Sequence, residues 1–169
     1  MSHLPAVDDN DHVQGPRDAP IVLIEYGDYQ CPYCGEEYPE LKAVQQAMGN
    51  GMCFVFRNFP LTQAHAHAER AAEFAEAAAS IGRFWEMHDM LYENQQALDD
   101  HNLVRYAKQL GMSDELIQSA LNGDFRTRVQ HDFRGGVRAG VNGTPCLFIN
   151  GQRYDDARDA QSLLALFRG

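Results

Sequence analysis

The segment Cys31-Pro32-Tyr33-Cys34 holds the residues with the clearest chemical potential in this sequence. An apolar, β-branched segment at 21–26 precedes it, and apolar residues follow at roughly helical spacing up to position 48. Cys31 is therefore expected at the start of a helix, where free backbone N–H groups and the helix dipole stabilise a thiolate. Cys34 would lie one turn further on, within disulfide reach. An exposed, ionised Cys31 that attacks and a Cys34 that resolves the mixed disulfide would suit thiol–disulfide exchange.

A structural metal site is the main alternative for this cysteine pair. Zinc would need two further ligands at ligand-like spacing. Cys53 and Cys146 each stand alone in an expected strand, and His65 and His67 diverge if they lie two positions apart on a helix. We therefore predict no metal site and favour a redox pair, while a zinc-binding structural domain and an inert pair stay open as alternatives.

The remaining cysteines and several ring-bearing residues are interpreted as structural. Cys53 and Cys146 are interpreted as small buried hydrophobic residues in strands, and a regulatory third thiol at Cys146, close to the cysteine pair, is the alternative. Four other side chains are expected to pack between helices or lie on the surface, and their alternative role is to line a substrate groove: His65, His67, Trp85 and His88.

The elements that must position the cysteine pair follow a simple order. A strand at 21–26, a helix at 31–48 and a strand at 53–58 make a β-α-β unit with parallel strands and a right-handed crossover. The chain then has a helical pattern up to about position 138, although Gly135-Gly136 weakens the last helix and leaves its end undefined. Strands at 146–149 and 152–154 are joined by Asn150-Gly151, a strong hairpin signal, and a last helix follows.

This order predicts an α/β domain with a helical insertion, because both ends of the helical block return to strands of one sheet. Residues 1–20 are polar and contain prolines, which predicts an N-terminal arm with a short edge strand at 12–14. Residues 21–61 and 141–169 are predicted to form the core. Residues 62–140 are predicted to form the inserted helical subdomain.

Charge and hydropathy narrow the classes of partner. The chain of 169 residues carries a net charge of −10, which disfavours binding to nucleic acid or to an anionic membrane surface. No apolar run approaches the roughly 18 residues that a membrane span requires, and no apolar signal segment precedes position 15. A soluble protein is expected, cytoplasmic as given, or periplasmic or otherwise exported if a signal was removed.

Several motifs together resemble the DsbA-like family of thioredoxin-fold thiol:disulfide oxidoreductases. They are the stretch at 26–34 that ends in the cysteine pair, the residues Gly82-Arg83-Phe84-Trp85, Gly143-Thr144-Pro145, and Ile149-Asn150-Gly151. The similarity covers about residues 12–168. It implies a thioredoxin-like fold, a central mixed sheet with a helical insertion between its two halves. It also implies disulfide exchange with cysteine-containing polypeptide substrates and a recycling redox partner.

The resemblance also implies roles for individual residues. Cys31 is expected to attack and Cys34 to resolve, with Pro32, Tyr33, Thr144 and Pro145 at the substrate-binding surface. The Thr144-Pro145 bond is expected to be cis, which would let a substrate strand pair with the backbone of Thr144 beside Cys31. The alternative is that Pro145 only begins a strand.

Glu25 is the third catalytic candidate. It shares a strand face with Leu23, where burial of a carboxylate is costly unless it is protonated or solvated. In the resemblance it matches the buried acid that thioredoxin-like proteins place behind the resolving cysteine. We hypothesise that Glu25, with a raised pKa, carries the proton of Cys34 during exchange. A strand-end carboxylate that reaches solvent is the alternative.

The predicted activity is therefore thiol–disulfide exchange in which the Cys31–Cys34 disulfide is the redox centre and no other cofactor is required. The neutral Tyr33 and the Pro32-Tyr33 pair, familiar from glutaredoxins, predict a potential nearer the ~−200 mV of glutaredoxins than the ~−120 mV of DsbA. Oxidase, reductase and isomerase directions are not distinguished. A non-catalytic, redox-sensitive binding or holdase protein is the competing functional class.

Overall fold

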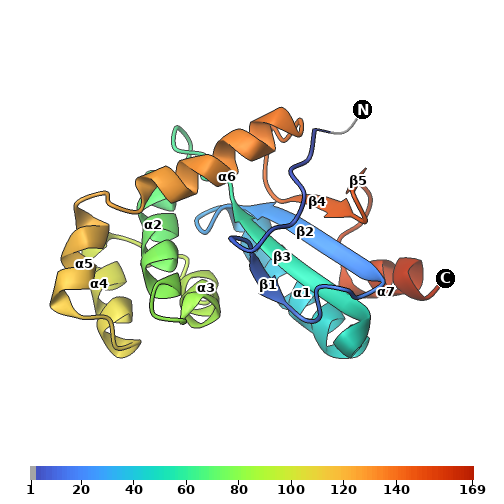
Figure 1. The fold of residues 1–169 in the computed structure, drawn as a ribbon, viewed down its shortest axis with the longest axis horizontal. Coiled ribbons are helices and arrows are strands. Elements are labelled where there is room, and N and C mark those ends of the chain that lie inside the picture. The colour runs from blue at the N-terminus through green and yellow to red at the C-terminus, as the bar shows by residue number, and fades with distance from the viewer. Residues whose placement is uncertain (1–2) are drawn as a thin grey trace.

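A five-stranded mixed sheet is the centre of the fold in the computed structural model, which describes residues 3–169 (Figure 1). Its order is β1-β3-β2-β4-β5; β2 and β3 are parallel and the other neighbours antiparallel. The strands are β1 (His12–Gln14), β2 (Ile21–Gly27), β3 (Met52–Asn58), β4 (Cys146–Ile149) and β5 (Gln152–Tyr154). The predicted thioredoxin-like arrangement is confirmed, including the edge strand at 12–14.

Strand β2 lies between β3 and β4 and is covered on both faces. Alternate residues point to opposite sides, so Leu23 joins one apolar cluster with Phe54 and Leu147, while Ile24 joins another with Val55. This double burial explains why the strand is apolar throughout. It also leaves no open face on which a side chain such as Glu25 could reach water.

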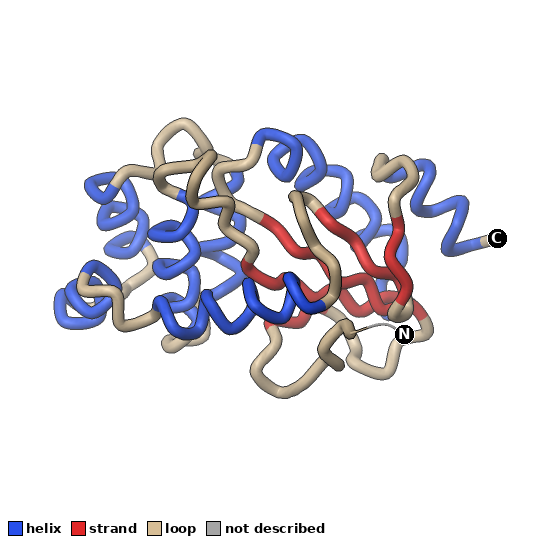
Figure 2. The backbone as a smooth tube through the Cα atoms, turned by 90° about the horizontal axis from the view of Figure 1, so that it is seen from above, coloured by secondary structure: helices blue, strands red, loops and turns tan. Residues whose placement is uncertain are grey.

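Helices cover the sheet and extend the molecule at one end. Helix α1 (Pro32–Met48) is followed by a 3₁₀ turn at Gly49–Gly51 and packs beside α7 (Ala160–Arg168). The helical block comprises α2 (Ala68–Ala79), α3 (Phe84–Tyr92), α4 (Asp100–Gln109), α5 (Asp114–Leu121) and α6 (Arg126–Arg138). Figures 1 and 2 show most of this block beside the sheet, with α6 running back across it. Within residues 3–169, no helix has both the length and the apolar character needed to cross a bilayer.

Helix α6 continues through Gly135-Gly136, the pair that left its end undefined in the sequence. A Cβ atom at Gly136 would lie 2.7 Å from the Phe59 ring and 3.0 Å from the Tyr26 ring. The small residue therefore allows α6 to approach the sheet closely. The stabilising contact is tertiary, which local helix propensity does not register.

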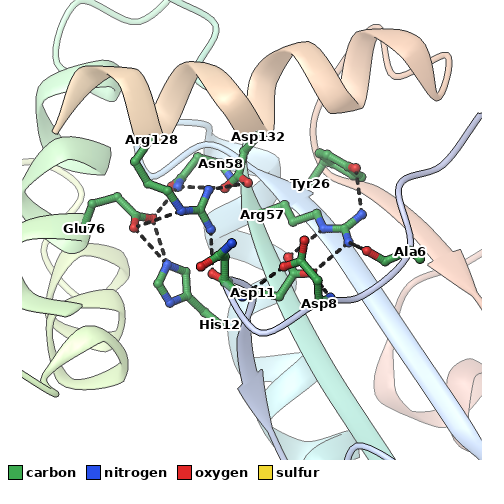
Figure 3. A network of polar contacts seen from close by, with 11 residues as sticks. Ala6, Asp8, Asp11, His12, Tyr26, Arg57, Asn58, Glu76, Arg128 and Asp132 are labelled. Atoms are coloured by element: carbon green, nitrogen blue, oxygen red, sulfur yellow. Dashed lines mark hydrogen bonds and ion pairs between the residues drawn. The ribbon is translucent and has the colours of Figure 1, made fainter. Parts of the chain in front are cut away.

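A buried polar network fastens the N-terminal arm to β3 and to the helical block (Figure 3). Arg57 donates to both carboxylate oxygens of Asp11 at 2.9 Å and to the Tyr26 hydroxyl at 3.0 Å. Burial opposes ionisation of Asp11, but hydrogen bonds and charge from Arg57 outweigh it and lower its pKa. The arm is thus held by a paired, desolvated guanidinium.

The same network reaches α2 and α6 on its other side. Asp132 of α6 accepts hydrogen bonds from the backbone N–H of Asn58 at 2.9 Å and from Arg128 at 2.6 Å. Glu76 of α2 lies 2.8 Å from the Nε2 atom of His12 and accepts from the Asn58 side chain at 2.7 Å. These contacts join the arm, the sheet and two helices at one point, which fixes the helical block relative to the sheet (Figure 3).

Candidate active site

The turn between β2 and α1 is organised by Asp28. Its Oδ1 atom accepts from the backbone N–H groups of Gln30 at 2.7 Å and Cys31 at 3.2 Å. Its Oδ2 atom accepts from the Leu61 N–H at 2.9 Å and lies 2.8 Å from Nδ1 of His65. A single buried carboxylate therefore holds the turn between β2 and α1 against the loop that follows β3.

Cys31 lies at the start of α1, as the sequence predicts. It is the residue that caps the helix N-terminus, and Pro32 occupies the first turn, where its missing N–H has no cost. The Cys31 sulfur lies 3.6 Å from the carbonyl oxygen of Thr144, and the Thr144-Pro145 peptide bond is cis. The structure thus brings Cys31 and the predicted Thr144-Pro145 loop together.

The expectation that Cys31 is open to water is wrong. Its exposed fraction is 3%, while Cys34 is fully buried and Tyr33 is 63% exposed. The Thr144 carbonyl lies against the sulfur, and the Gln95 side chain donates to the carbonyl oxygens of Tyr29 and Cys31 at 2.9 Å each. Cys31 therefore lies just beneath a surface formed by exposed Pro32 and Tyr33.

The two thiols have opposite acidities. A hydrogen bond from the Cys34 thiol is the largest stabiliser of the Cys31 thiolate. Burial opposes it, but the backbone N–H groups of Cys34 and Tyr33 also help, and the pKa of Cys31 is lowered to about 5. Burial, the hydrogen bond to Cys31 and the charge of Glu25 raise the pKa of Cys34 well above its usual range. The pair is polarised, with one ionised sulfur and one protonated sulfur behind it.

Glu25 lies in β2 and is 2% exposed, so the alternative of a carboxylate that reaches solvent does not hold. Burial raises its pKa well above the ordinary value, and the negative charge of Glu37 raises it further. The charges of Glu25 and the Cys34 thiol in turn influence each other. A buried acid with a raised pKa, close to the second thiol, can take up or release one proton.

Glu37 is a buried acid that the sequence reasoning missed. It lies on the inward face of α1 with Cys34 and Leu41, and its pKa is raised, chiefly by burial. Arg158 lies close to it, with Nε 3.4 Å from Oε2. The signal was available, because positions 34, 37, 41 and 44 follow the spacing of a buried helix face.

The candidate histidines contact residues near the cysteine pair, and within residues 3–169 their hydrogen bonds do not involve the two sulfurs. His65 and His67 precede α2 and are not on a helix, contrary to expectation; His65 supports Asp28. His88 is buried, with Nδ1 2.9 Å from the Tyr29 hydroxyl, and burial lowers its pKa well below the usual range. Trp85 packs beside it and against Phe54.

The other two cysteines lie on the opposite side of the sheet. Cys53 and Cys146 are free, buried and part of the apolar cluster that contains Ile24, whereas Cys31 and Cys34 belong to the other cluster. Cys146 is thus separated from the dithiol although it follows Pro145 directly. In the part of the chain that the structure describes, no three His, Cys, Asp or Glu side chains group as metal ligands.

Comparisons with known proteins agree with this architecture. A family model described as Thioredoxin matches residues 7–167. The "Na(+)/H(+) antiporter NhaA 1" of Salinispora arenicola is 39% identical over 163 residues, which cover 96% of this chain and 25% of that protein. The chain thus spans about a quarter of the length of the antiporters that it matches.

Two solved structures show the same fold at low identity. Oxidised BdbD from Bacillus subtilis has a TM-score of 0.87 at 21% identity, over 99% of this chain and 96% of that one. Wolbachia pipientis alpha-DsbA1 has a TM-score of 0.82 at 18% identity, over 99% and 94% of the two chains. Because the family model matches nearly the whole of this chain, the chain belongs to the thioredoxin family. Its fold is the DsbA-like form of the thioredoxin fold.

Proposed function

We propose that this protein exchanges disulfides with cysteine-containing polypeptides through Cys31 and Cys34. The observation that carries the proposal is the opposite acidity of two adjacent thiols, with the pKa of Cys31 at about 5 and that of Cys34 raised. An ionised thiol at a helix N-terminus is a nucleophile at neutral pH, and a protonated neighbour does not compete with it. Two such sulfurs can carry two electrons, so the proposal needs no metal, nucleotide or organic cofactor.

The exchange has two steps in the reducing direction. The Cys31 thiolate attacks a substrate disulfide, forms a mixed disulfide and releases one substrate thiolate, which takes a proton from water. Cys34 then loses its proton and attacks the Cys31 sulfur, which forms the Cys31–Cys34 disulfide and releases the second substrate thiol. The substrate gains two electrons and the protein loses two. The same steps in reverse oxidise a substrate dithiol, and a recycling redox partner restores the starting state in either direction.

Glu25 is proposed to manage the proton of Cys34. In the reducing direction its carboxylate takes up that proton, and in the oxidising direction the protonated acid returns it to the Cys34 thiolate. A raised pKa suits both tasks, because proton transfer is most efficient when the pKa of the acid lies near the working pH. Pro32, Tyr33, Thr144 and Pro145 are proposed to contact the substrate around Cys31.

The direction of disulfide exchange and the cellular compartment are linked in this proposal. A potential near ~−200 mV would suit exchange with a glutathione pool, whereas disulfide formation suits an exported protein and reduction a cytoplasmic one. Equilibration of the Cys31/Cys34 pair with glutathione, followed by alkylation, measures this potential. A redox potential above that of DsbA or below that of thioredoxin would contradict the expected intermediate potential.

The test of the activity is turnover of a disulfide-containing peptide, followed by acid quench and alkylation. Cys31→Ser should abolish reaction, and Cys34→Ser should accumulate a mixed disulfide at Cys31. Glu25→Gln should slow resolution and change its pH profile while leaving attack by Cys31 intact. If the wild type shows no turnover, a non-catalytic holdase is favoured. If its thiols react with the alkylating reagent only after a chelator is added, a zinc site is favoured.

A further inference from the structure

A cleft of about 390 Å³ lies beside the cysteine pair, between α1 and the segment that precedes α7. Tyr33, the exposed residue between the two cysteines, forms part of its lining. Because Tyr33 is only two positions from Cys31, a polypeptide joined to Cys31 would have its neighbouring residues close to this cleft. The cleft is therefore positioned to contact the residues that flank a substrate cysteine.

Negative charge dominates this cleft. Its lining contains five carboxyl groups and one guanidinium: Glu36, Glu37, Glu40, Asp156 and Asp159, with Arg158. Two of the carboxyl groups serve the fold, since Glu40 accepts from the N–H of Ala160 and Asp159 caps α7. Glu36 and Asp156 are exposed and make no side-chain hydrogen bond or ion pair with residues 3–169.

Glu37 engages the positive charge of the cleft lining. It is 4% exposed and lies between the neighbouring acid Glu25 and Arg158, whose Nε lies 3.4 Å from its Oε2 atom. Arg158 is the one basic residue of the cleft lining, and it is paired with this buried carboxyl group. It therefore does not offset the negative charge of the exposed Glu36 and Asp156, which a cationic group that enters the cleft would meet.

We propose that this cleft selects polypeptides that carry Lys or Arg within a few residues of the reacting cysteine. A long side chain with a terminal cation can extend past Tyr33, whose ring offers an exposed aromatic face, to Glu36 and Asp156. The inference rests on the proposed function, because it names the class of substrate for the same dithiol. Charge complementarity of this kind acts mainly on encounter rate and specificity.

The experiment compares three peptides that each contain one internal disulfide and differ only in the residue that flanks it: Lys, Gln or Glu. Reduction by wild-type protein, by Glu36→Gln/Asp156→Asn and by the control Asp18→Asn/Asp124→Asn is followed by quench and alkylation. Asp18 and Asp124 are also exposed and without side-chain partners among residues 3–169, but Asp18 precedes β2, at the end of the strand away from Cys31. Both variants remove two negative charges, so the overall charge is matched.

The wild type should reduce the Lys peptide about tenfold faster than the Glu peptide at low salt, and high salt should weaken this preference. The cleft variant should lose most of the preference, and the control variant should keep it. Three outcomes would overturn the inference. They are reduction of the Lys and Glu peptides at the same rate by the wild type, retention of the wild-type preference for the Lys peptide by the cleft variant, and equal loss of that preference in both variants. An uncharged disulfide, 2-hydroxyethyl disulfide, separates the two claims: if it also fails to react, the proposed function fails as well.

Discussion

The acidity of Cys31 provides the sharpest test of the proposed chemistry. With a pKa of about 5, roughly 99% of this thiol is ionised at pH 7, against a few per cent for an ordinary cysteine. The largest contribution is the hydrogen bond from the Cys34 thiol. A hydrogen bond to a charged group contributes about 1.5–3 kcal/mol, which corresponds to about 1–2 pKa units. Cys34→Ala should therefore raise the pKa of Cys31 to about 6–7.

The assay is the rate of iodoacetamide alkylation between pH 3 and 9, with thiolate absorbance near 240 nm as a second signal. Cys34→Ser is the matched control, because its hydroxyl still donates a hydrogen bond and should keep the pKa of Cys31 near that of the wild type. A wild-type midpoint above pH 8 would refute the reasoning. So would identical midpoints in Cys34→Ala and Cys34→Ser, since the hydrogen bond would then contribute nothing.

The same ionisation links stability to pH. The folded pKa of Cys31 lies below its unfolded value, so its stabilising contribution is complete above pH ~8.5 and is lost as the pH falls through about 5. Between pH 7 and pH 5 the reduced protein should lose roughly 2 kcal/mol of unfolding free energy from this group. The raised pKa of Glu25 acts in the opposite sense, because its protonation relieves a cost as the pH falls. The difference between the wild type and Cys31→Ser in urea unfolding isolates the cysteine contribution, and a difference independent of pH would contradict it.

Three further substitutions test other contacts. Thr144→Val should change the pKa of Cys31 by less than Cys34→Ala does, because the Thr144 hydroxyl makes no hydrogen bond within residues 3–169 and only the Thr144 carbonyl oxygen lies 3.6 Å from the sulfur; an equal or larger rise in the alkylation profile would contradict that ranking. Arg57→Met should lower the unfolding free energy by about 3–5 kcal/mol, since it leaves the Asp11 carboxylate buried and unpaired; a loss below about 1 kcal/mol in urea unfolding would show that the pair contributes little. Gly136→Ala should be net destabilising by about 1 kcal/mol, because overpacking against two rings costs more than the gain of about 1 kcal/mol in helix propensity, and a raised melting temperature would oppose this.

Much of the fold could be predicted because its signals are local and periodic. The apolar run at 21–26 and the Asn150-Gly151 turn each specify an element without reference to distant residues. The end of α6 could not be predicted in this way. Its glycines reduce helix propensity locally, and only the close approach to Phe59 explains why the helix continues.

For the candidate site too, local features could be predicted from the sequence, whereas contacts between distant residues could not. The start of a helix at Cys31 and the burial of Glu25 follow from neighbouring residues, so the sequence was sufficient for both. The burial of Cys31 was not predictable, because Thr144, whose carbonyl oxygen lies against the sulfur, and Gln95, which bonds to the Cys31 carbonyl, are distant in the chain. No local pattern around Gln95 indicates that its amide reaches the turn that contains Cys31.

The contact of Gln95 changes how the helical insertion should be understood. This residue lies between α3 and α4, yet it donates to two backbone carbonyls of the active-site turn and lies against Gly35, where a Cβ atom would collide with it. On the other side of the turn, Asp28 binds the loop that precedes α2. The loop that leads into the helical block and a loop within the block therefore both hold the segment that contains Cys31. In the proposed function, Cys31 lies beneath the surface and must become accessible before it attacks a substrate. The stability of these contacts should therefore determine the rate of the local opening that exposes Cys31.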